Sequence, residues 1–217
     1  QDSEVQLRQF VADASHELRT PLAAIRGYAE LTRRGPLSAD ATHALARISS
    51  QAERMTALVE DLLLLARLDA GRPLERADVD LTRLVLDAVS DAHAAGPNHQ
   101  WQLNLPDEPV TVIGDASRLT QVLTNLLANG RTHTPPGTRV TVTLAAGSGT
   151  VRVTVVDAGP GIPVDLLPHV FERFARGSTS RSRQDGSTGL GLAIVSAVVA
   201  AHGGDVSVTS RPGHTEF

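Results

Sequence analysis

His16 and Glu17 form the first pair of side chains whose types and spacing suit a chemical reaction. They lie in a run with an apolar residue every three or four positions, and Thr20 follows one helical turn later. A neutral imidazole nitrogen is a nucleophile near pH 7, and an adjacent carboxylate can hold the other ring N–H and fix the tautomer. The pair suits attack on phosphorus, but an exposed histidine beside an ordinary glutamate is the simpler interpretation. A zinc helix is excluded because position 20 is not a second histidine.

A second group of side chains suits the binding of a ligand with a metal ion. Asn125 and Asn129 are four residues apart on one face of a predicted helix, and amide oxygens suit a hard cation such as Mg²⁺. Asp157 ends a β-branched run and is followed by Gly159 and Gly161. A carboxylate there can accept a hydrogen bond from an exocyclic amine, while the glycines permit close backbone approach.

A third group consists of Gly189, Leu190 and Gly191, which open an apolar run that ends near residue 201. Glycines at a helix N-terminus leave N–H groups free for an anion. Neither the Lys-Ser/Thr of a P-loop nor the Rossmann glycine spacing is present. Each pattern also has an ordinary interpretation, since Asn129-Gly130 is a strong hairpin-turn signal and glycine-rich turns need not bind anything.

The elements that must position these groups change character near residue 70. Residues 1–70 carry two apolar stripes with steps of three and four, separated by Gly35-Pro36, and predict a helical hairpin. The stripe of the second helix consists of Leu45, Ile48, Ala52, Met55, Val59, Leu62 and Ala66. Additional leucines at 58 and 63–65 make this face wider than one partner helix covers. Two copies forming a four-helix bundle are therefore predicted.

Residues 71–217 alternate short strands with helices and predict an α/β sandwich with a mixed sheet, so the chain as a whole has a multidomain α and α+β fold class. Strands are predicted at 110–113, 139–144, 151–156 and 205–208, and helices at 81–94, 117–127 and 190–201. The predicted strands 139–144 and 151–156 are joined by a short link that contains Gly and Ser, which predicts that these two strands are antiparallel.

The overall composition excludes several classes of protein. A net charge of -4 and a pI near 6.1 give no broad attraction for nucleic acid, so no nucleic-acid partner is expected. The absence of Cys excludes disulfides and thiolate metal sites. No apolar run approaches the roughly 18 residues that span a bilayer, so any membrane attachment is expected through segments outside this chain.

Together these motifs resemble the catalytic core of sensor histidine kinases of two-component systems. Residues 10–28 resemble the H box of the dimerisation and phosphotransfer domain, in the subfamily with His-Glu-x-x-Thr. Residues 115–129 resemble the N box of the Bergerat ATP-binding fold, and residues 157–162 and 186–192 resemble its two glycine boxes. Phe171-Glu172-Arg173-Phe174 resembles the F box that precedes the ATP lid.

The resemblance implies two domains, a phosphotransfer hairpin at 1–70 and an ATP-binding catalytic domain at 71–217 whose terminal strand would be cut short. It implies autophosphorylation of His16, transfer to an aspartate in the receiver domain of a response regulator, and phosphatase activity toward that regulator. Glu17 would orient His16, and Thr20 would position water for dephosphorylation. The protein would be a homodimer and the cytoplasmic portion of a bacterial inner-membrane sensor.

The resemblance also implies roles in a site for ATP and Mg²⁺. Asn129 would coordinate the metal with support from Asn125, and Asp157 would read the adenine amino group. The two glycine boxes would shape the pocket through Gly159, Gly161, Gly189, Leu190 and Gly191. The residues that would meet the phosphates are Arg131, His133 and one or more of Arg173, Arg176, Arg181 and Arg183.

Three positions depart from the family pattern and are expected to lower affinity. Gly130 stands where Ala is usual and should weaken the helix end by up to about 1 kcal/mol, Thr132 replaces a common Lys, and Ser187 replaces a common Gly. Three other classes of protein remain open. They are a chaperone or DNA-repair ATPase of the same superfamily, a non-catalytic signalling scaffold, and a metal-dependent hydrolase.

Overall fold

The computed structural model describes residues 14–15, 17–30, 39–147, 149–175 and 188–217. The chain divides into two compact units, Gln1–Arg67 and Leu68–Phe217. His16, the predicted hairpin loop and most of the predicted ATP lid lie outside the described residues. Each unit is considered by itself below.

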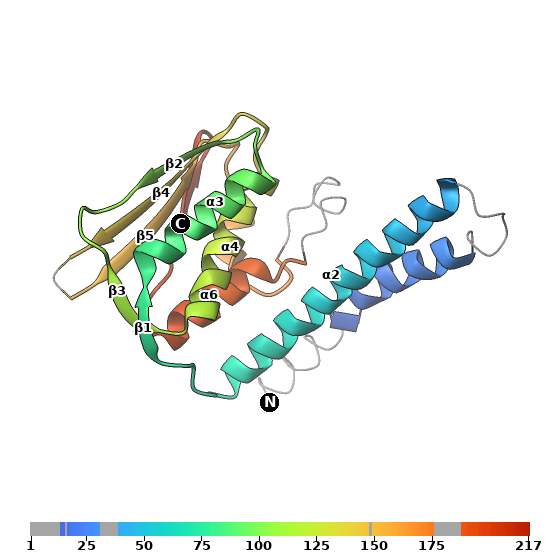
Figure 1. Cartoon of the computed structure of the whole chain (residues 1–217), viewed down its shortest axis with the longest axis horizontal. Coiled ribbons are helices and arrows are strands. Elements are labelled where there is room, and N and C mark those ends of the chain that lie inside the picture. The colour runs from blue at the N-terminus through green and yellow to red at the C-terminus, as the bar shows by residue number, and fades with distance from the viewer. Residues whose placement is uncertain (1–13, 16, 31–38, 148, 176–187) are drawn as a thin grey trace. The chain divides into compact units, whose positions relative to one another are not determined.

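The first unit is a helical hairpin, as predicted. Residues 14–15 and 17–30 are helical, and the long helix α2 covers Ala39–Asp69 (Figure 1). Tyr28 near the end of the first helix meets Arg47 near the start of α2. The Arg47 Nε atom donates to the Tyr28 hydroxyl at 3.4 Å, and the guanidinium carbon lies 6.0 Å from the ring centroid. The two helices are therefore antiparallel.

The apolar side chains of this hairpin are only partly buried within one chain. In α2, Ala44, Leu58 and the pair Leu64 and Leu65 are buried. The predicted stripe of α2 is more open, with Leu45 54% exposed and Val59 41% exposed. Leu22 and Leu63 are each 52% exposed. An isolated hairpin thus leaves large apolar side chains in contact with water.

The second unit contains the predicted mixed sheet, with strand order β2-β4-β5-β7-β6. Its strands are β2 (Gln100–Asn104), β4 (Arg139–Ala146), β5 (Val151–Asp157), β6 (Thr209–Arg211) and β7 (His214–Glu216). β2 is parallel to β4, and the other neighbouring pairs are antiparallel. The predicted antiparallel pairing of β4 with β5 is confirmed.

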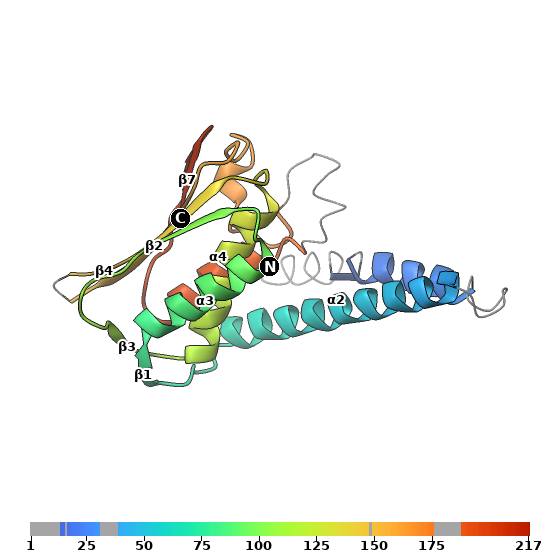
Figure 2. The same cartoon turned by 45° about the horizontal axis from the view of Figure 1, so that its top comes forward.

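Three helices cover one face of this sheet, as Figures 1 and 2 show. They are α3 (Leu81–Ala95), α4 (Ala116–Thr132) and α6 (Gly191–Ala201). β4 alternates as expected for a sheet with one covered face, with Val140, Val142 and Leu144 fully buried and the intervening threonines half-buried. The core between the layers is aliphatic, in keeping with the 3% aromatic content.

Some predicted elements are wrong or missing. The strand predicted at 205–208 does not form, and pairing with β7 begins only at Thr209, because the register is set by the turn at Pro212-Gly213. The strand predicted at 110–113 is β3 (Thr111–Gly114), but it pairs with β1 (Ala77–Asp80) in a small antiparallel sheet, and β1 was not predicted. β2 was not predicted either, and the terminal strand expected at the end of the chain is the short strand β7. A short 3₁₀ helix covers Leu167–His169. None of the described helices combines the length and hydropathy of a membrane-spanning helix.

The interpretation of Asn129-Gly130 as a hairpin turn is also wrong, because both residues lie inside α4. Gly130 is buried, and a Cβ added there would lie 3.4 Å from both methyl groups of Val140. This distance is an ordinary contact, so the site has room for the alanine that is usual in the family.

We expect Gly130→Ala to raise the free energy of unfolding by up to about 1 kcal/mol, since glycine is the weaker helix former. Gly137→Ala is the control, because a Cβ at Gly137 would meet nothing within 4 Å but Gly137 has φ +88. That change should lower the free energy of unfolding by about 1–2 kcal/mol. Urea unfolding of both variants measures the difference, and a destabilised Gly130→Ala would contradict the expected fit against Val140.

Candidate functional site

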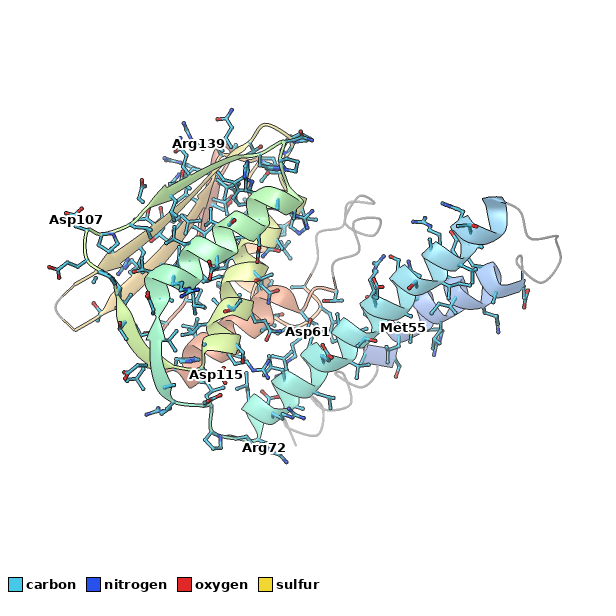
Figure 3. The ribbon with its side chains drawn as sticks, in the orientation of Figure 1. Met55, Asp61, Arg72, Asp107, Asp115 and Arg139 are labelled. Atoms are coloured by element: carbon cyan, nitrogen blue, oxygen red, sulfur yellow. The ribbon has the colours of Figure 1, made fainter. Side chains whose placement is uncertain are left out.

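Asp115 and His202 fix the start of α4, the helix that carries both candidate metal-binding amides. Asp115 is the N-cap residue, and its carboxylate accepts from the Arg118 N–H at 3.1 Å and the Ser117 hydroxyl at 2.7 Å (Figure 3). Burial opposes ionisation of Asp115, but these two hydrogen bonds, the Glu75 N–H and the charge of Arg118 together lower its pKa. The helix therefore begins at a well-satisfied anionic cap.

The His202 ring joins this cap to the end of α6. Its Nδ1 lies 2.8 Å from the Val198 carbonyl oxygen and must donate there, so Nε2 accepts the Asp115 N–H at 3.0 Å. Neither Asp115 nor His202 was among the predicted site residues. The signal for Asp115 was available, since an acidic residue directly before a helical run is a common N-cap.

Asn125 projects from α4 to the first residue of α6, and Asn129 lies one helical turn further along α4. The Asn125 Nδ2 donates to the Gly191 carbonyl oxygen at 3.2 Å, which connects the predicted N box to the second glycine box. The Asn129 Nδ2 is buried, and it is the side-chain atom that lacks any hydrogen-bond partner within the described part of the chain. An orphaned buried amide costs roughly 1–3 kcal/mol, which a bound ligand would offset.

Asp157 ends β5 and is 8% exposed. Its Oδ1 accepts the Gly159 N–H at 2.9 Å, which orients the carboxylate. Burial raises the pKa of Asp157, although the Gly159 N–H and the charges of His214 and His133 oppose the shift. A buried carboxylate with one oxygen occupied retains acceptor capacity for an external donor.

The turn after Asp157 is held by the β6–β7 hairpin. Gly161 has φ +83, and a Cβ there would lie 2.9 Å from the backbone carbon of Arg211. The Ile162 N–H donates to the Ser210 hydroxyl at 2.8 Å, and the Gly213 N–H donates to the Gly159 carbonyl at 2.7 Å. The chain therefore needs glycine at 161 for a backbone-to-backbone contact.

The second glycine segment is joined to the predicted F box. Gly189 has φ +70, and its carbonyl oxygen accepts the Phe174 N–H at 2.8 Å. Phe174 itself has φ +61. Leu190 is fully buried, so only its backbone can face a ligand, and Gly191 begins α6 with the free N–H groups of a helix N-terminus.

We expect Gly189→Ala and Gly191→Ala to separate folding from ligand binding. A Cβ at 189 would lie 2.9 Å from the Phe174 Cα with an unfavourable φ, so this change should destabilise the second unit by about 2 kcal/mol or more. A Cβ at 191 would meet Asn125 at no less than 3.5 Å, so Gly191→Ala should fold normally. Thermal unfolding and ATP titration of both variants measure the two effects. Normal stability of Gly189→Ala would contradict the close packing on Phe174.

Two of the residues predicted to contact the phosphates, Arg131 and Arg173, contact other groups in the structure. The stem of Arg131 packs on Gly96, where an added Cβ would lie 2.7 Å from the Arg131 Cδ. Within the unit Leu68–Phe217, the Arg173 Nη2 donates to both carboxylate oxygens of Asp69, at 2.8 and 2.6 Å. Arg176, Arg181 and Arg183 lie outside the described residues.

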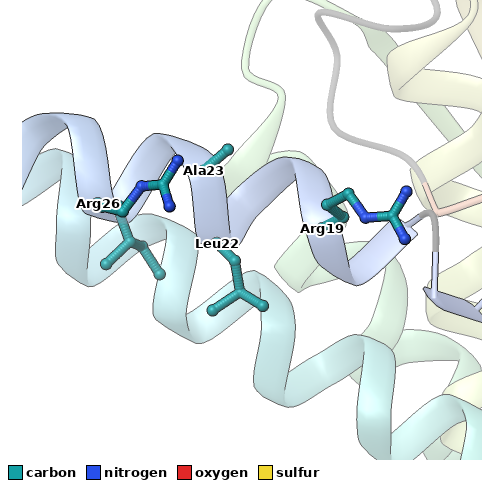
Figure 4. Close-up of a pocket in the computed structure, with 5 residues that line it drawn as sticks. Arg19, Leu22, Ala23 and Arg26 are labelled. Atoms are coloured by element: carbon teal, nitrogen blue, oxygen red, sulfur yellow. The ribbon is translucent and has the colours of Figure 1, made fainter.

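The predicted phosphotransfer group lies on the hairpin. Glu17 is half-buried and Thr20 is exposed, and both are helical. His16 is outside the described residues. A surface hollow on the same helix is lined by Arg19, Leu22, Ala23, Ile25 and Arg26 (Figure 4).

A magnesium ion fits the donors of α4 better than a transition metal would. Within the described residues, no group of three or more His, Asp or Glu side chains is placed to hold a metal ion. The amide oxygens of Asn129 and Asn125 are hard ligands, and Mg²⁺ commonly takes few protein ligands beside water and substrate phosphates. Asn129 and Asn125 are thus the residues that would hold this ion.

This fold and site define a class: an α/β-sandwich nucleotide-binding domain preceded by a helical hairpin. Residues 114–217 match the family "Histidine kinase-, DNA gyrase B-, and HSP90-like ATPase", and residues 6–71 match the "His Kinase A (phospho-acceptor) domain". The chain belongs to the sensor histidine kinases of two-component systems. The second match disfavours a chaperone or DNA-repair ATPase, because the phospho-acceptor domain has no role there.

Three similar proteins illustrate the relationship. The probable sensor histidine kinase TcrY of Mycobacterium tuberculosis is 67% identical over 218 residues, which cover 100% of this chain but 46% of TcrY. The chain therefore spans less than half of that relative. The histidine kinase AdeS of Acinetobacter baumannii aligns with a TM-score of 0.75 and 26% identity, covering 93% of this chain and 94% of AdeS. The mycobacterial sensor histidine kinase MprB aligns with a TM-score of 0.56 and 32% identity, covering 65% of this chain and 93% of the MprB chain.

Proposed function

We propose that this chain is the catalytic core of a sensor histidine kinase that phosphorylates its own His16 with ATP. The phosphoryl group then passes to an aspartate in the receiver domain of a response regulator. Membership of the family supports both steps.

The observation that carries the nucleotide part of the proposal is the Asn129 amide. Its Nδ2, a hydrogen-bond donor, is buried without a partner among the described residues, although the Nδ2 of Asn125 on the same helix face is paired with Gly191. A buried donor without an acceptor supports a ligand position there, because an acceptor such as a phosphate oxygen would satisfy it. Asp157, with one carboxylate oxygen on Gly159, supplies a fitting acceptor for an adenine amino group.

The proposed reaction forms one bond and breaks one bond. A ring nitrogen of His16 attacks the γ-phosphorus of ATP, the N–P bond forms, and the bond from the γ-phosphorus to the ADP oxygen breaks. Glu17 holds the other ring N–H and stabilises the positive charge that develops on the imidazole. The free N–H groups at the start of α6 bind phosphate oxygens. Asn129 and Asn125 would hold Mg²⁺, which would neutralise phosphate charge.

We further propose that the protein acts as a homodimer through the hairpin. Leu22, Leu45, Val59 and Leu63 are large apolar side chains that remain at least 41% exposed in one chain. A second hairpin would remove them from water, and each buried side chain of this size contributes about 1.5–3 kcal/mol. The exposed apolar faces thus support a four-helix bundle.

The regulator would meet the helix that carries His16. Arg19, Ala23 and Arg26 follow His16 by three, seven and ten residues in the sequence, and they line the hollow of Figure 4. Two guanidinium groups there suit a partner whose reacting group is a carboxylate. Exposed Thr20 would orient water for the phosphatase reaction. The chain would be the cytoplasmic portion of a bacterial inner-membrane sensor.

Incubation with Mg-ATP labelled in the γ-phosphate tests the proposal. The chain should acquire a phosphate that is labile in acid and stable in base, as expected of a phosphohistidine. An acid-stable phosphate would contradict a histidine acceptor. ATP binding without any label would favour the non-catalytic signalling scaffold.

A further inference from the structure

One side chain, Thr134, contacts both halves of the candidate nucleotide site. It lies in the loop after α4, and its hydroxyl donates to the Gly130 carbonyl oxygen at 2.5 Å. On its other side, the Thr134 methyl carbon would lie 2.5 Å from a Cβ built on Gly159. Thr134 thus touches the helical turn that carries Asn129 and the turn that follows Asp157.

The contact with Gly159 leads directly to the carboxylate of Asp157. The Gly159 N–H donates to the Asp157 Oδ1 at 2.9 Å, and the Gly159 carbonyl accepts the Gly213 N–H at 2.7 Å. This short turn is therefore held between the β6–β7 hairpin and the methyl group of Thr134. Movement of Thr134 would shift the peptide group that orients the carboxylate.

His99 fixes the rotamer of the Thr134 hydroxyl. The His99 Nε2 lies 3.0 Å from the Thr134 oxygen. Because the hydroxyl hydrogen is directed to Gly130, the oxygen accepts in this second bond and Nε2 carries the hydrogen. The loop of His99 is joined to the loop of Thr134 a second time, by the Gly137 N–H and the Asn98 carbonyl oxygen at 2.7 Å.

We propose that Thr134 is a positioning residue for nucleotide selection, which holds Asp157 at a fixed spacing from Asn129. His99 supports it by orienting its hydroxyl. The inference rests on the proposed ATP site and assigns Thr134 no contact with the nucleotide itself. In the proposed site Asp157 reads the base, while Asn129 holds the metal and the phosphates. The distance between Asp157 and Asn129 therefore decides whether one nucleotide can contact both residues. A small displacement of either residue would weaken nucleotide binding strongly. Discrimination between adenine and guanine should therefore depend on Thr134.

Thr134→Val in the full 217-residue chain tests this role. Valine keeps the methyl group beside Gly159 and removes both hydrogen bonds of the hydroxyl. Thr138→Val is the matched control, since the Thr138 hydroxyl donates to the Pro135 carbonyl at 2.7 Å in the same loop. Affinities for the β,γ-imido analogues of ATP and GTP, with Mg²⁺, are measured by calorimetry together with thermal unfolding.

We expect Thr134→Val to bind the ATP analogue about tenfold more weakly, since two hydrogen bonds that hold the site are lost. The ratio of ATP to GTP affinity should fall by about fivefold. Thr138→Val loses one hydrogen bond of the same loop and should keep both affinities. Thr134→Ser, which keeps the hydroxyl and loses only the methyl contact with Gly159, should bind within about threefold of the wild type.

Equal affinities in Thr134→Val and the wild type would overturn the inference while leaving the proposed function intact. Equal losses in Thr134→Val and Thr138→Val would also overturn it, because the effect would then be general loosening of the loop. A wild-type chain that binds neither analogue would overturn the proposed function first. If Thr134→Val does not fold, His99→Phe is tested instead. We expect His99→Phe to bind the ATP analogue about threefold more weakly than the wild type. An unchanged affinity would contradict the inference.

Discussion

Replacing Asp157 with Asn should weaken ATP binding by about 50-fold, the scale of a hydrogen bond to a charged group. The Gly159 N–H holds the Oδ1 of the present carboxylate. In the variant the single amide oxygen would stay with that N–H, and the amide NH₂ would then face the adenine amino group. The amide NH₂ of the variant and the adenine amino group are both donors, so the hydrogen bond that the carboxylate accepts in the wild type would be lost. Calorimetric titration with the ATP analogue measures the loss.

The same substitution should leave the fold at least as stable near pH 7. Burial raises the pKa of Asp157 above its ordinary value of 3.8, so between pH 3.8 and the raised pKa the folded state holds a proton that the unfolded state releases. The stability contributed by this group is complete below pH 3.8 and is lost as pH rises through the raised pKa. Asparagine has no carboxyl proton to release, so the free energy of unfolding of Asp157→Asn should vary less with pH than that of the wild type between pH 3.8 and the raised pKa.

Ligand binding should have the opposite pH dependence in the wild type. The carboxylate must be ionised for Oδ2 to accept from the adenine amino group while Oδ1 accepts from the Gly159 N–H, so affinity should fall as pH decreases through the raised pKa. Asp165→Asn, in an exposed position of the same segment, is the control and should change neither quantity. If Asp157→Asn bound ATP as tightly as the wild type, Asp157 would not be the base-reading residue.

Replacing His16 with Gln should abolish phosphorylation and leave the affinity for ATP unchanged. Glutamine can occupy a helix and form hydrogen bonds, but its amide nitrogen is not a nucleophile. The nucleotide residues all lie in the separate unit Leu68–Phe217, so their affinity should not depend on position 16. Labelled ATP measures the first effect and calorimetry measures the second.

His43→Gln is the matched control for this experiment. His43 is an exposed histidine of α2 and has no proposed role in the reaction. This variant should be labelled to the wild-type extent. Full labelling of His16→Gln, or loss of labelling in His43→Gln, would remove His16 from the proposal.

Much of the fold was predictable because periodicity is a strong signal for long elements. α3 and α4 each contain the predicted helical range and extend beyond it. The strand predicted at 205–208 failed because β-branched residues alone do not provide a partner strand. β2 was missed although Trp101 and Leu103 alternate with polar residues, and this period of two is visible in the sequence.

The site was predictable where a motif has fixed spacing and less so where contacts are long-range. Asn125, Asn129 and Asp157 are recognisable from local sequence, and the structure adds their partners. The roles of His202 and Thr134 depend on contacts with residues 87 and 35 positions away in the chain. No local pattern marks such residues, because the positioning arises only when separate elements pack.

Mapping the phosphate after incubation with Mg-ATP tests the central claim most directly. Tryptic digestion at alkaline pH releases residues 9–19 as one peptide, in which His16 is the sole histidine. Mass spectrometry is predicted to find phosphate on that histidine, and less of it in Asp157→Asn at an ATP concentration that does not saturate the variant. Phosphate on any other residue, or none in a chain that binds ATP, would contradict the assignment of this protein as a kinase of its own His16.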